Sequence, residues 1–207
     1  MIVLILAAVF IAIIILILKN NNDGYDDYDD IFSPQKATGR RGEAIASGMI
    51  KSILDNGDVI ITGLHLIHDG QKTEFDNIII NKNGLFIIEV KNYSGRLEGS
   101  EGTREWTKYH VSDGGNTYEK IIKNPIKQVK RQIYILKSYL SALGITTWIN
   151  GYVFLLNGND CSASSEYLLY DIDDIERKIH TTEKNKLTPD TIDSIKQALK
   201  HWTYKND

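Results

Sequence analysis

The chain has 207 residues, and 24 Lys and Arg stand against 27 Asp and Glu, for a formal net charge of −3. This balance gives no global basic field of the kind that marks many nucleic-acid-binding proteins. The length suits one domain of moderate size with an appendage. Cys161 is the only cysteine, which excludes an internal disulfide and a metal site built from several cysteines.

Residues 1–18 carry no charged or polar side chain after the initiator methionine. As a helix they reach about 27 Å, close to the roughly 30 Å of a bilayer's hydrocarbon core, and so predict an uncleaved transmembrane anchor. The alternatives are a secretory signal peptide, which normally has a basic start and a small-residue cleavage site, and a buried core helix. Lys19 follows the span and nothing basic precedes it. This favours a single-pass protein of the cell membrane with a cytoplasmic soluble domain.

Residues 19–35 are polar and acidic, which predicts a solvated linker. One lysine against five aspartates gives residues 1–30 a net charge of −4, which leaves about +1 for residues 31–207. The main domain is therefore close to neutral.

The rest of the chain mixes helical and strand-like patterns. Helices are expected at Gly39–Leu54, Ile126–Leu143, Asp173–Ile179 and Pro189–Trp202. Strands are expected at Asp58–Ile67, on both sides of Asn81–Gly84, and at Arg96–Glu98, Glu105–Val111, Trp148–Leu156 and Tyr167–Tyr170, while Tyr118–Ile122 is ambiguous. Helices before and after a mixed sheet predict an α/β fold.

One hairpin concentrates charged residues. Runs rich in Ile, Val and Phe flank Asn81–Gly84, which indicates a β-hairpin. Glu89 and Lys91 are two residues apart on the second strand and point to the same face. A four-residue loop, 81–84, sets Asp76 opposite Glu89, and a two-residue turn at 83–84 sets it opposite Lys91. A three-residue loop would turn the two acids to opposite faces.

Two carboxylates and an ammonium on one sheet face are costly unless something compensates their charges. Mg²⁺ resolves the conflict, because it binds through one or two carboxylates and substrate phosphate. A lysine nearby orients or deprotonates a water, or stabilises charge that builds on a phosphate. The alternative is a surface hairpin with solvated charges.

Glu43 is a further candidate, from the helix before the hairpin. It lies one turn before Ala46 on the line of Ala46, Ile50 and Leu54, so we expect its side chain to aim inward. The alternative is a first-turn glutamate that complements the helix dipole.

The helix 126–143 separates into faces. Its predicted buried stripe consists of Ile126, Val129, Ile133, Leu136, Leu140 and Leu143. Gln128 and Gln132 border this stripe one turn apart, either as surface residues or as side chains that reach a site over the sheet edge. Four basic residues form either a solvated face or a stripe that contacts nucleic-acid phosphates: Lys123, Lys127, Lys130 and Arg131.

With these residues in place, the chain resembles the NERD family, the nuclease-related domains. The matching blocks come in order over roughly residues 36–156: Gly39–Glu43, Phe75–Ile80, Phe86–Gly95, Trp106 and Asn124–Gln128. No proline precedes Asp76, Asn77 stands where the family commonly has His, and Tyr93 where it commonly has Trp. Residues 157–207 match nothing by this resemblance and are expected to be a strand and helix extension of the same domain.

The resemblance implies a restriction-endonuclease-like fold of the PD-(D/E)xK type, with the acids and the lysine gathered at one sheet edge. By this resemblance Asp76 and Glu89 bind Mg²⁺ (or Mn²⁺), Glu43 is an additional acid, Lys91 assists the attacking water, and Gln128 supports the site. The expected function is a membrane-anchored, metal-dependent nuclease that acts on DNA. The alternatives are a non-catalytic nucleic-acid-binding module and a protein scaffold at the membrane.

Overall fold

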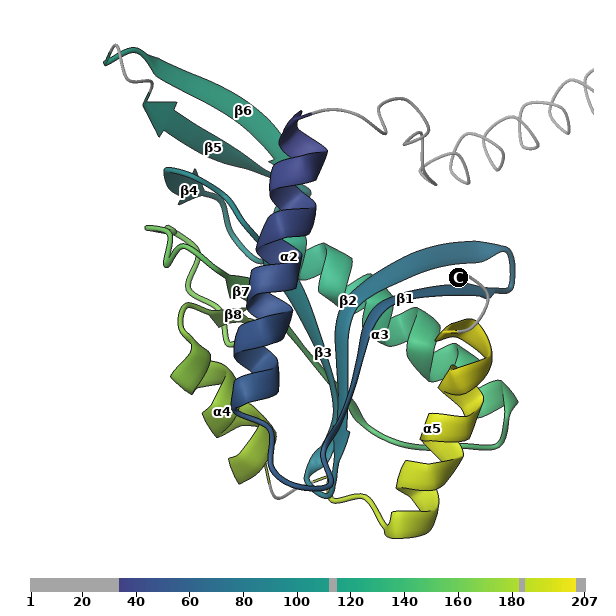
Figure 1. The fold of residues 1–207 in the computed structure, drawn as a ribbon. Helices are drawn as coiled ribbons and strands as arrows, with labels where there is room; N and C mark the ends of the chain where they lie inside the picture. Colours follow the sequence, from purple (N-terminus) through teal and green to yellow (C-terminus); the bar gives the residue numbers. More distant parts are fainter. Residues whose placement is uncertain (1–33, 112–114, 183–184, 204–207) are drawn as a thin grey trace, which may run out of the picture. The chain divides into compact units, whose positions relative to one another are not determined.

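The structure is a computed structural model that describes residues 34–111, 115–182 and 185–203 (Figure 1). Its helices are α2 (Pro34–Ser52), α3 (Pro125–Ala142), α4 (Ile172–Thr181) and α5 (Pro189–Thr203). Its strands are β1 (Val59–His68), β2 (Gln71–Asn81), β3 (Gly84–Lys91), β4 (Arg96–Glu98), β5 (Glu105–Val111), β6 (Thr117–Lys123), β7 (Ile149–Leu155) and β8 (Leu168–Leu169).

The predicted anchor, residues 1–18, lies outside the described residues, as does the predicted linker up to residue 33. Within the described part of the chain, no helix has both the length and the apolar character needed to cross a membrane. The helix expected from Gly39 begins earlier, at Pro34. A proline is well suited to a first helical turn, because its missing N–H would have no partner there.

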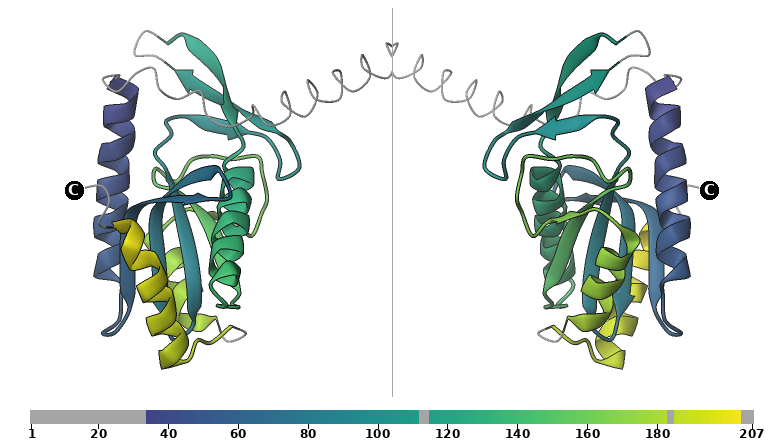
Figure 2. Two further views of the ribbon diagram at one scale, coloured as in Figure 1. Left: turned by 90° about the vertical axis from the view of Figure 1, so that its right-hand side faces the viewer. Right: turned by 90° about the vertical axis from the view of Figure 1, so that its left-hand side faces the viewer.

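The central sheet is mixed, with five strands in the order β1-β2-β3-β7-β8. The first three strands are antiparallel neighbours, whereas β3, β7 and β8 run parallel. Helices cover both faces of this sheet (Figure 2). The predicted α/β class, a mixed central sheet flanked by helices, is therefore confirmed.

Alternating side chains of the strands pack into two separate hydrophobic cores. On β2, Ile78 and Ile80 belong to the core that α3 and α5 complete, while Ile79 faces the core that α2 and α4 complete. Because both faces are covered, β3 reads as a continuous apolar run that is buried as far as Val90. Glu89 interrupts this run as a charged residue that is only 2% exposed, which marks the position as exceptional.

A second sheet of three antiparallel strands, β4-β5-β6, follows directly after β3. Leu97 and Trp106 anchor this sheet in the core that α3 and α5 complete. At Gly95, with a φ of +79°, a side chain would collide with the backbone of Tyr109 at 1.9 Å, so only glycine allows the chain to pass from β3 into this sheet. The expected strands 96–98 and 105–111 are confirmed, and the ambiguous segment is β6.

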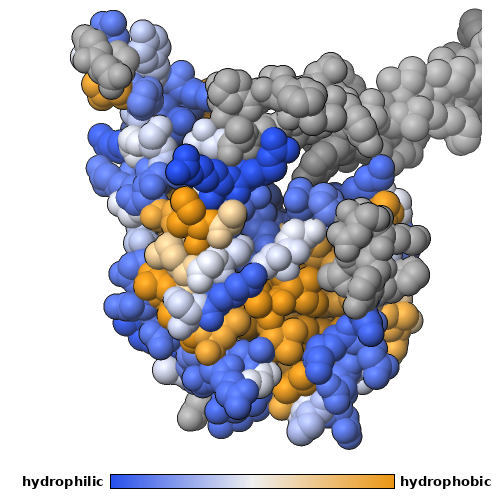
Figure 3. All heavy atoms as spheres, in the orientation of Figure 1, coloured by the Kyte–Doolittle hydropathy of each residue, from blue (hydrophilic) through white to orange (hydrophobic). Residues whose placement is uncertain are grey.

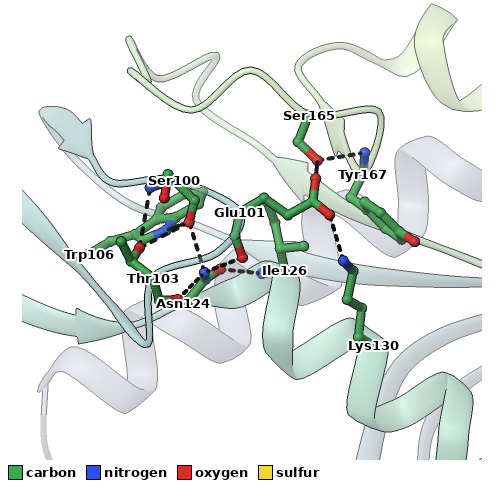
Figure 4. A network of polar contacts seen from close by, with 9 residues as sticks. All are labelled: Ser100, Glu101, Thr103, Trp106, Asn124, Ile126, Lys130, Ser165 and Tyr167. Atoms are coloured by element: carbon green, nitrogen blue, oxygen red, sulfur yellow. Dashed lines mark hydrogen bonds and ion pairs between the residues drawn. The ribbon is translucent and has the colours of Figure 1, made fainter.

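A polar network fastens the 100–103 loop to α3 (Figure 4). The Asn124 side chain accepts a hydrogen bond from the N–H of Ile126 and so caps the helix, while its amide donates to the carbonyl oxygens of Ser100 and Thr103. Glu101 pairs with Lys130 at 2.5 Å and accepts a hydrogen bond from Ser165. One end of α3, the second sheet and the segment after β7 are thereby joined.

In the orientation of Figure 1, hydrophilic residues predominate over β5, β6 and the start of α2 (Figure 3). Hydrophobic residues gather lower on the same view, over the sheet. The polar end of this face is the end at which β3 finishes at Lys91 and the chain enters β4.

Candidate active site

The hairpin register brings the two predicted acids level. Asn81 pairs with Gly84 and Asn77 with Ile88, so Lys82 and Asn83 form the loop, and Asp76 comes opposite Glu89. The alternative that set Asp76 opposite Lys91, and the three-residue loop that would have parted the acids, are both wrong.

Glu89 is the centre of a set of hydrogen bonds. Lys91 Nζ donates to Glu89 Oε1 at 2.6 Å, which confirms that these two side chains share a face. Gln128 Nε2 donates to the same oxygen at 2.5 Å, and Gln132 Nε2 donates to Oε2 at 2.6 Å. Three donors from β3 and α3 thus hold this buried carboxylate in one orientation.

Asp76 is largely buried beside Glu89, and its Oδ2 accepts a hydrogen bond of 2.7 Å from the N–H of Val90. Burial, and then the negative charge of Glu89, raise the pKa of Asp76 to about 8. The hydrogen bond from Val90 and the charge of Lys91 oppose this rise without cancelling it. With both acids ionised, this face would carry more negative charge than Lys91 neutralises, so Asp76 holds its proton to a higher pH than usual.

Lys91 remains a cation. Burial alone would lower its pKa, but the charge of Glu89, together with Tyr93 and Asp76, outweighs burial and raises the pKa above its ordinary value. A lysine held in this way cannot take a proton from water. Of the three roles predicted for it, orienting a water and stabilising negative charge on a phosphate are those that a cation can perform, and all three stay predictions.

Glu43 lines an open cleft of about 360 Å³ together with Glu74 and Asp76. Burial, followed by the charges of Glu74 and Glu89, raises the pKa of Glu43. Since α2 begins at Pro34, Glu43 is not in its first turn, so the helix-dipole alternative is wrong. Glu43 is half-buried and shares the cleft with Glu74 and Asp76, in keeping with the inward direction that its place on the apolar line predicted. Arg40 and Lys51 lie on the same cleft wall.

Gly42 explains how α2 brings Glu43 to this place. A side chain at Gly42 would lie 2.6 Å from the Cβ and Nδ2 atoms of Asn92, just beyond β3. Asn92 Nδ2 also donates to the carbonyl oxygen of Thr38 at 3.2 Å. The absent side chain therefore lets the helix pass directly over the segment that follows Lys91.

Gln132, which the sequence placed with Gln128 on the border of the apolar stripe, reaches the site. It is 1% exposed, and besides Glu89 its amide donates to the carbonyl oxygen of Glu74 at 2.8 Å. The predicted apolar stripe is confirmed at Ile126, Val129, Leu136 and Leu140, but Leu143 is 53% exposed, and Gln132 and Ile135 are also buried. The one available signal was its position one turn after Gln128, on the same border of the stripe.

The residues present fit a hard divalent cation. Among the described residues, no three His, Cys, Asp or Glu side chains are grouped closely enough to hold a metal on their own. Mg²⁺, however, commonly takes only one or two carboxylates and completes its shell with water and substrate phosphate. Asp76 and Glu89 supply two such carboxylates, and the raised pKa of Asp76 reports the excess negative charge that a cation would relieve. Glu43 stays the predicted third acid.

The four basic residues predicted to contact nucleic acid differ in their surroundings. Lys130 pairs with Glu101, with its Nζ 4.6 Å from the ring centre of Tyr167. Arg131 Nη1 donates to the carbonyl oxygen of Lys72 at 3.3 Å. Lys123 and Lys127 are exposed. Their contacts with nucleic acid stay predictions.

Comparison with known proteins identifies the family. The model of the nuclease-related domain, NERD, matches residues 38–156, which include all five predicted site residues. The chain belongs to the NERD family. The PD-(D/E)xK nucleases are the general kind of fold to which NERD domains are assigned, and the acids at the end of this mixed sheet accord with it.

A further similarity of this NERD protein is to an uncharacterized protein of Bacillus anthracis. The two are 22% identical over 165 residues, which span 79% of this chain and 76% of the relative. No solved structure matches the chain.

Proposed function

We propose that this NERD protein is a metal-dependent nuclease that hydrolyses phosphodiester bonds of DNA. The observation that carries the proposal is the pair of level acids, Asp76 and Glu89, with the cationic Lys91 bound to one of them and an open cleft at the other. The membership of the family supports nuclease-like chemistry in general.

The protein groups divide the work of hydrolysis. Asp76 and Glu89 would hold Mg²⁺ or Mn²⁺, with Glu43 as an additional acid; when bound, the ion would act as a Lewis acid on the phosphate and on water. Gln128 and Gln132 keep the Glu89 carboxylate in one orientation. Lys91 keeps a positive charge where the phosphate gains negative charge. In the net reaction, water oxygen bonds to phosphorus, the ester P–O bond breaks, and the leaving oxygen receives a proton.

The sharpest test uses Asp76→Asn in the full-length chain. Removing this charge relieves repulsion from Glu89, so the variant should be at least as stable as wild type at pH 8 while cleavage is lost. Linear, circular and single-stranded DNA are incubated with Mg²⁺, Mn²⁺ or EDTA. The matched control is Asp69→Asn, at an exposed position in the β1–β2 turn. Metal-dependent cleavage that survives both Asp76→Asn and Glu89→Gln would refute the site.

The non-catalytic alternative also has an observation in its favour. Both oxygens of Glu89 already accept hydrogen bonds, and no larger metal-binding cluster is present among the described residues. Nucleic-acid binding without cleavage in any metal would support a binding module, and the absence of both would support a protein scaffold.

The proposed place of action is the membrane. The apolar run at residues 1–18 and the lysine that follows it support a single-pass anchor with a cytoplasmic domain. A protease added to intact cells should leave the domain uncut, and digestion of the domain would overturn this orientation.

A further inference from the structure

One face of the β4-β5-β6 sheet carries lysines and aromatic residues without acids. Directly opposite residues in an antiparallel sheet share a face. Lys108 pairs with Lys120, and His110 pairs with Tyr118. The same face is anchored in the core by Trp106. We call the part formed by Lys108, Lys120, His110 and Tyr118 the lysine face.

The acids of these three strands all lie on the opposite face. Glu98 pairs with Thr107, Glu105 with Lys123, and Glu119 with Tyr109, and each of these pairs alternates with those of the lysine face. The lysine face therefore holds no carboxylate, whereas the opposite face mixes its three acids with Arg96 and Lys123. The lysine face differs in this respect from an ordinary soluble surface, on which charges of both signs are interspersed.

Lys108 and Lys120 form an unfavourable pair within the protein itself. Like charges directly opposite each other destabilise a sheet. Burial, and then the charge of Lys120, lower the pKa of Lys108. Within the described part of the chain, neither ammonium has a carboxylate partner. An anion placed between them would remove this repulsion.

The lysine face continues from the candidate active site. Tyr93 lies two residues after Lys91, on the segment that leads out of β3. Lys108 Nζ lies 5.9 Å from the ring centre of Tyr93. A series of neighbouring groups thus leads from Glu89 through Lys91 and Tyr93 to Lys108 and Lys120. Beyond them Tyr118 is 57% exposed.

We propose that the lysine face, with Tyr93, binds the phosphodiester backbone of the nucleic-acid substrate beside the phosphate that is cleaved. A chain of phosphates presents repeated anions at close spacing, which a single anion does not. Cations interleaved with exposed aromatic rings are the combination that holds nucleic-acid strands by charge and base stacking. The inference rests on the proposed nuclease function for the identity of the ligand, while the binding itself requires no catalysis.

The test measures binding by the full-length protein in detergent, with EDTA present to prevent cleavage. Fluorescence anisotropy follows a labelled single strand and a duplex of the same sequence as salt is raised. The variant is Lys108→Ala/Lys120→Ala. Its control, Lys82→Ala/Lys186→Ala, removes two exposed lysines near the β2–β3 turn, where Leu187 N donates to the Lys82 carbonyl oxygen. Lys108→Arg/Lys120→Arg keeps the charge.

Removing one lysine that binds a phosphate lowers the salt dependence of duplex binding by about 0.9 in log–log slope, so the slope of the double alanine variant should be smaller by about 1.8. Between 50 and 200 mM salt, its affinity should then fall about 12-fold less than that of wild type. The arginine variant and the control should behave as wild type. The single strand should show the smaller slope change of about 0.7 for each lysine removed.

The outcomes separate this inference from the proposed function. Metal-dependent cleavage with wild-type binding by the double alanine variant overturns the inference and leaves the nuclease proposal intact. If binding depends on the two lysines but no metal supports cleavage, the inference is supported and the nuclease proposal is refuted. Equal reductions in the alanine variant and the Lys82/Lys186 control overturn the inference, because they show a general charge effect. No binding by the wild type overturns it as well.

Discussion

Gln132→Ala is predicted to be among the most destabilising single changes at the candidate site. The Gln132 side chain donates to the charged Glu89 carboxylate at 2.6 Å and to the carbonyl oxygen of Glu74 at 2.8 Å. A hydrogen bond to a charged group contributes about 1.5–3 kcal/mol and a neutral one about 1 kcal/mol. Losing both should lower the free energy of unfolding by about 3 kcal/mol, because a carboxylate that is 2% exposed loses one of its donors.

Urea denaturation of a matched set of variants checks this value. Gln128→Ala removes a single bond to Glu89 from a less buried position, so its loss should be smaller. Gln132→Met fills most of the same space but has no hydrogen-bond donors. Comparing it with Gln132→Ala separates the energy of the lost hydrogen bonds from the cost of the cavity that alanine leaves. Gln197→Ala, on the exposed side of α5, should change the free energy of unfolding by less than about 0.5 kcal/mol.

A double-mutant cycle with Glu89→Gln tests the partner directly. If the loss at Gln132 comes from its bond to Glu89, the two changes should couple by about 1.5–2 kcal/mol, within the range found for residues in contact. A coupling near zero, or a larger loss for Gln128→Ala than for Gln132→Ala, would refute the view that Gln132 is the main support of the carboxylate.

Three further predictions concern charge, packing and capping. The pKa of Asp76 is raised from 3.8 to about 8, so the native state holds a proton that the unfolded state has lost, and without metal the free energy of unfolding should fall as pH rises between these values. Asp76→Asn should reduce that slope in urea titrations at pH 5 and pH 8. Gly42→Ala forces a Cβ to 2.6 Å from Asn92, which should cost about 1–3 kcal/mol in thermal or urea unfolding; an unchanged stability would show that α2 shifts freely. Asn124→Ala removes the cap of α3 and the bonds to the 100–103 loop, for a loss of about 2–3 kcal/mol by denaturation; a loss confined to the roughly 1 kcal/mol of a helix cap would mean that the loop bonds contribute little.

The β2–β3 hairpin shows how much of a structure the local sequence can predict. The apolar runs and the turn residues predicted two strands and left two even loops open. The choice between them depends on α4, because the side-chain amides of Asn81 and Asn83 both donate to the carbonyl oxygen of Ile179. Asn81 Oδ1 also accepts from the N–H of Asn83 at 2.9 Å. These hydrogen bonds to Ile179, nearly a hundred residues away along the chain, favour the observed register, and the local sequence pattern does not reveal them.

The buried face of α3 was predicted for Ile126, Val129, Leu136 and Leu140, but Leu143 was misplaced and Gln132 was left undecided for a related reason. Apolar periodicity seeks the largest hydrophobic face, and it placed Leu143 inside. In the structure a polar residue, Gln132, occupies the buried face because the carboxylate of Glu89 lies opposite and needs a donor. The burial of a polar side chain cannot be predicted from periodicity when it depends on a partner that is distant in the sequence. The residues that could be predicted are those whose direction follows from their own strand or helix: Glu43, Glu89 and Lys91.

The balance of charge distinguishes a functional site from a structural ion pair. One buried carboxylate with one ammonium and two amide donors, as at Glu89, is complete on its own. Adding Asp76 level with it breaks this balance, as the pKa of about 8 shows. Glu43 and Glu74 add two further acids in an open cleft that Arg40 and Lys51 also line. Such a cluster reduces stability unless a cation occupies it, so Mg²⁺ should raise the melting temperature of the wild type at pH 8 and leave that of Asp76→Asn nearly unchanged. An equal response of both proteins would mean that the excess charge serves no metal.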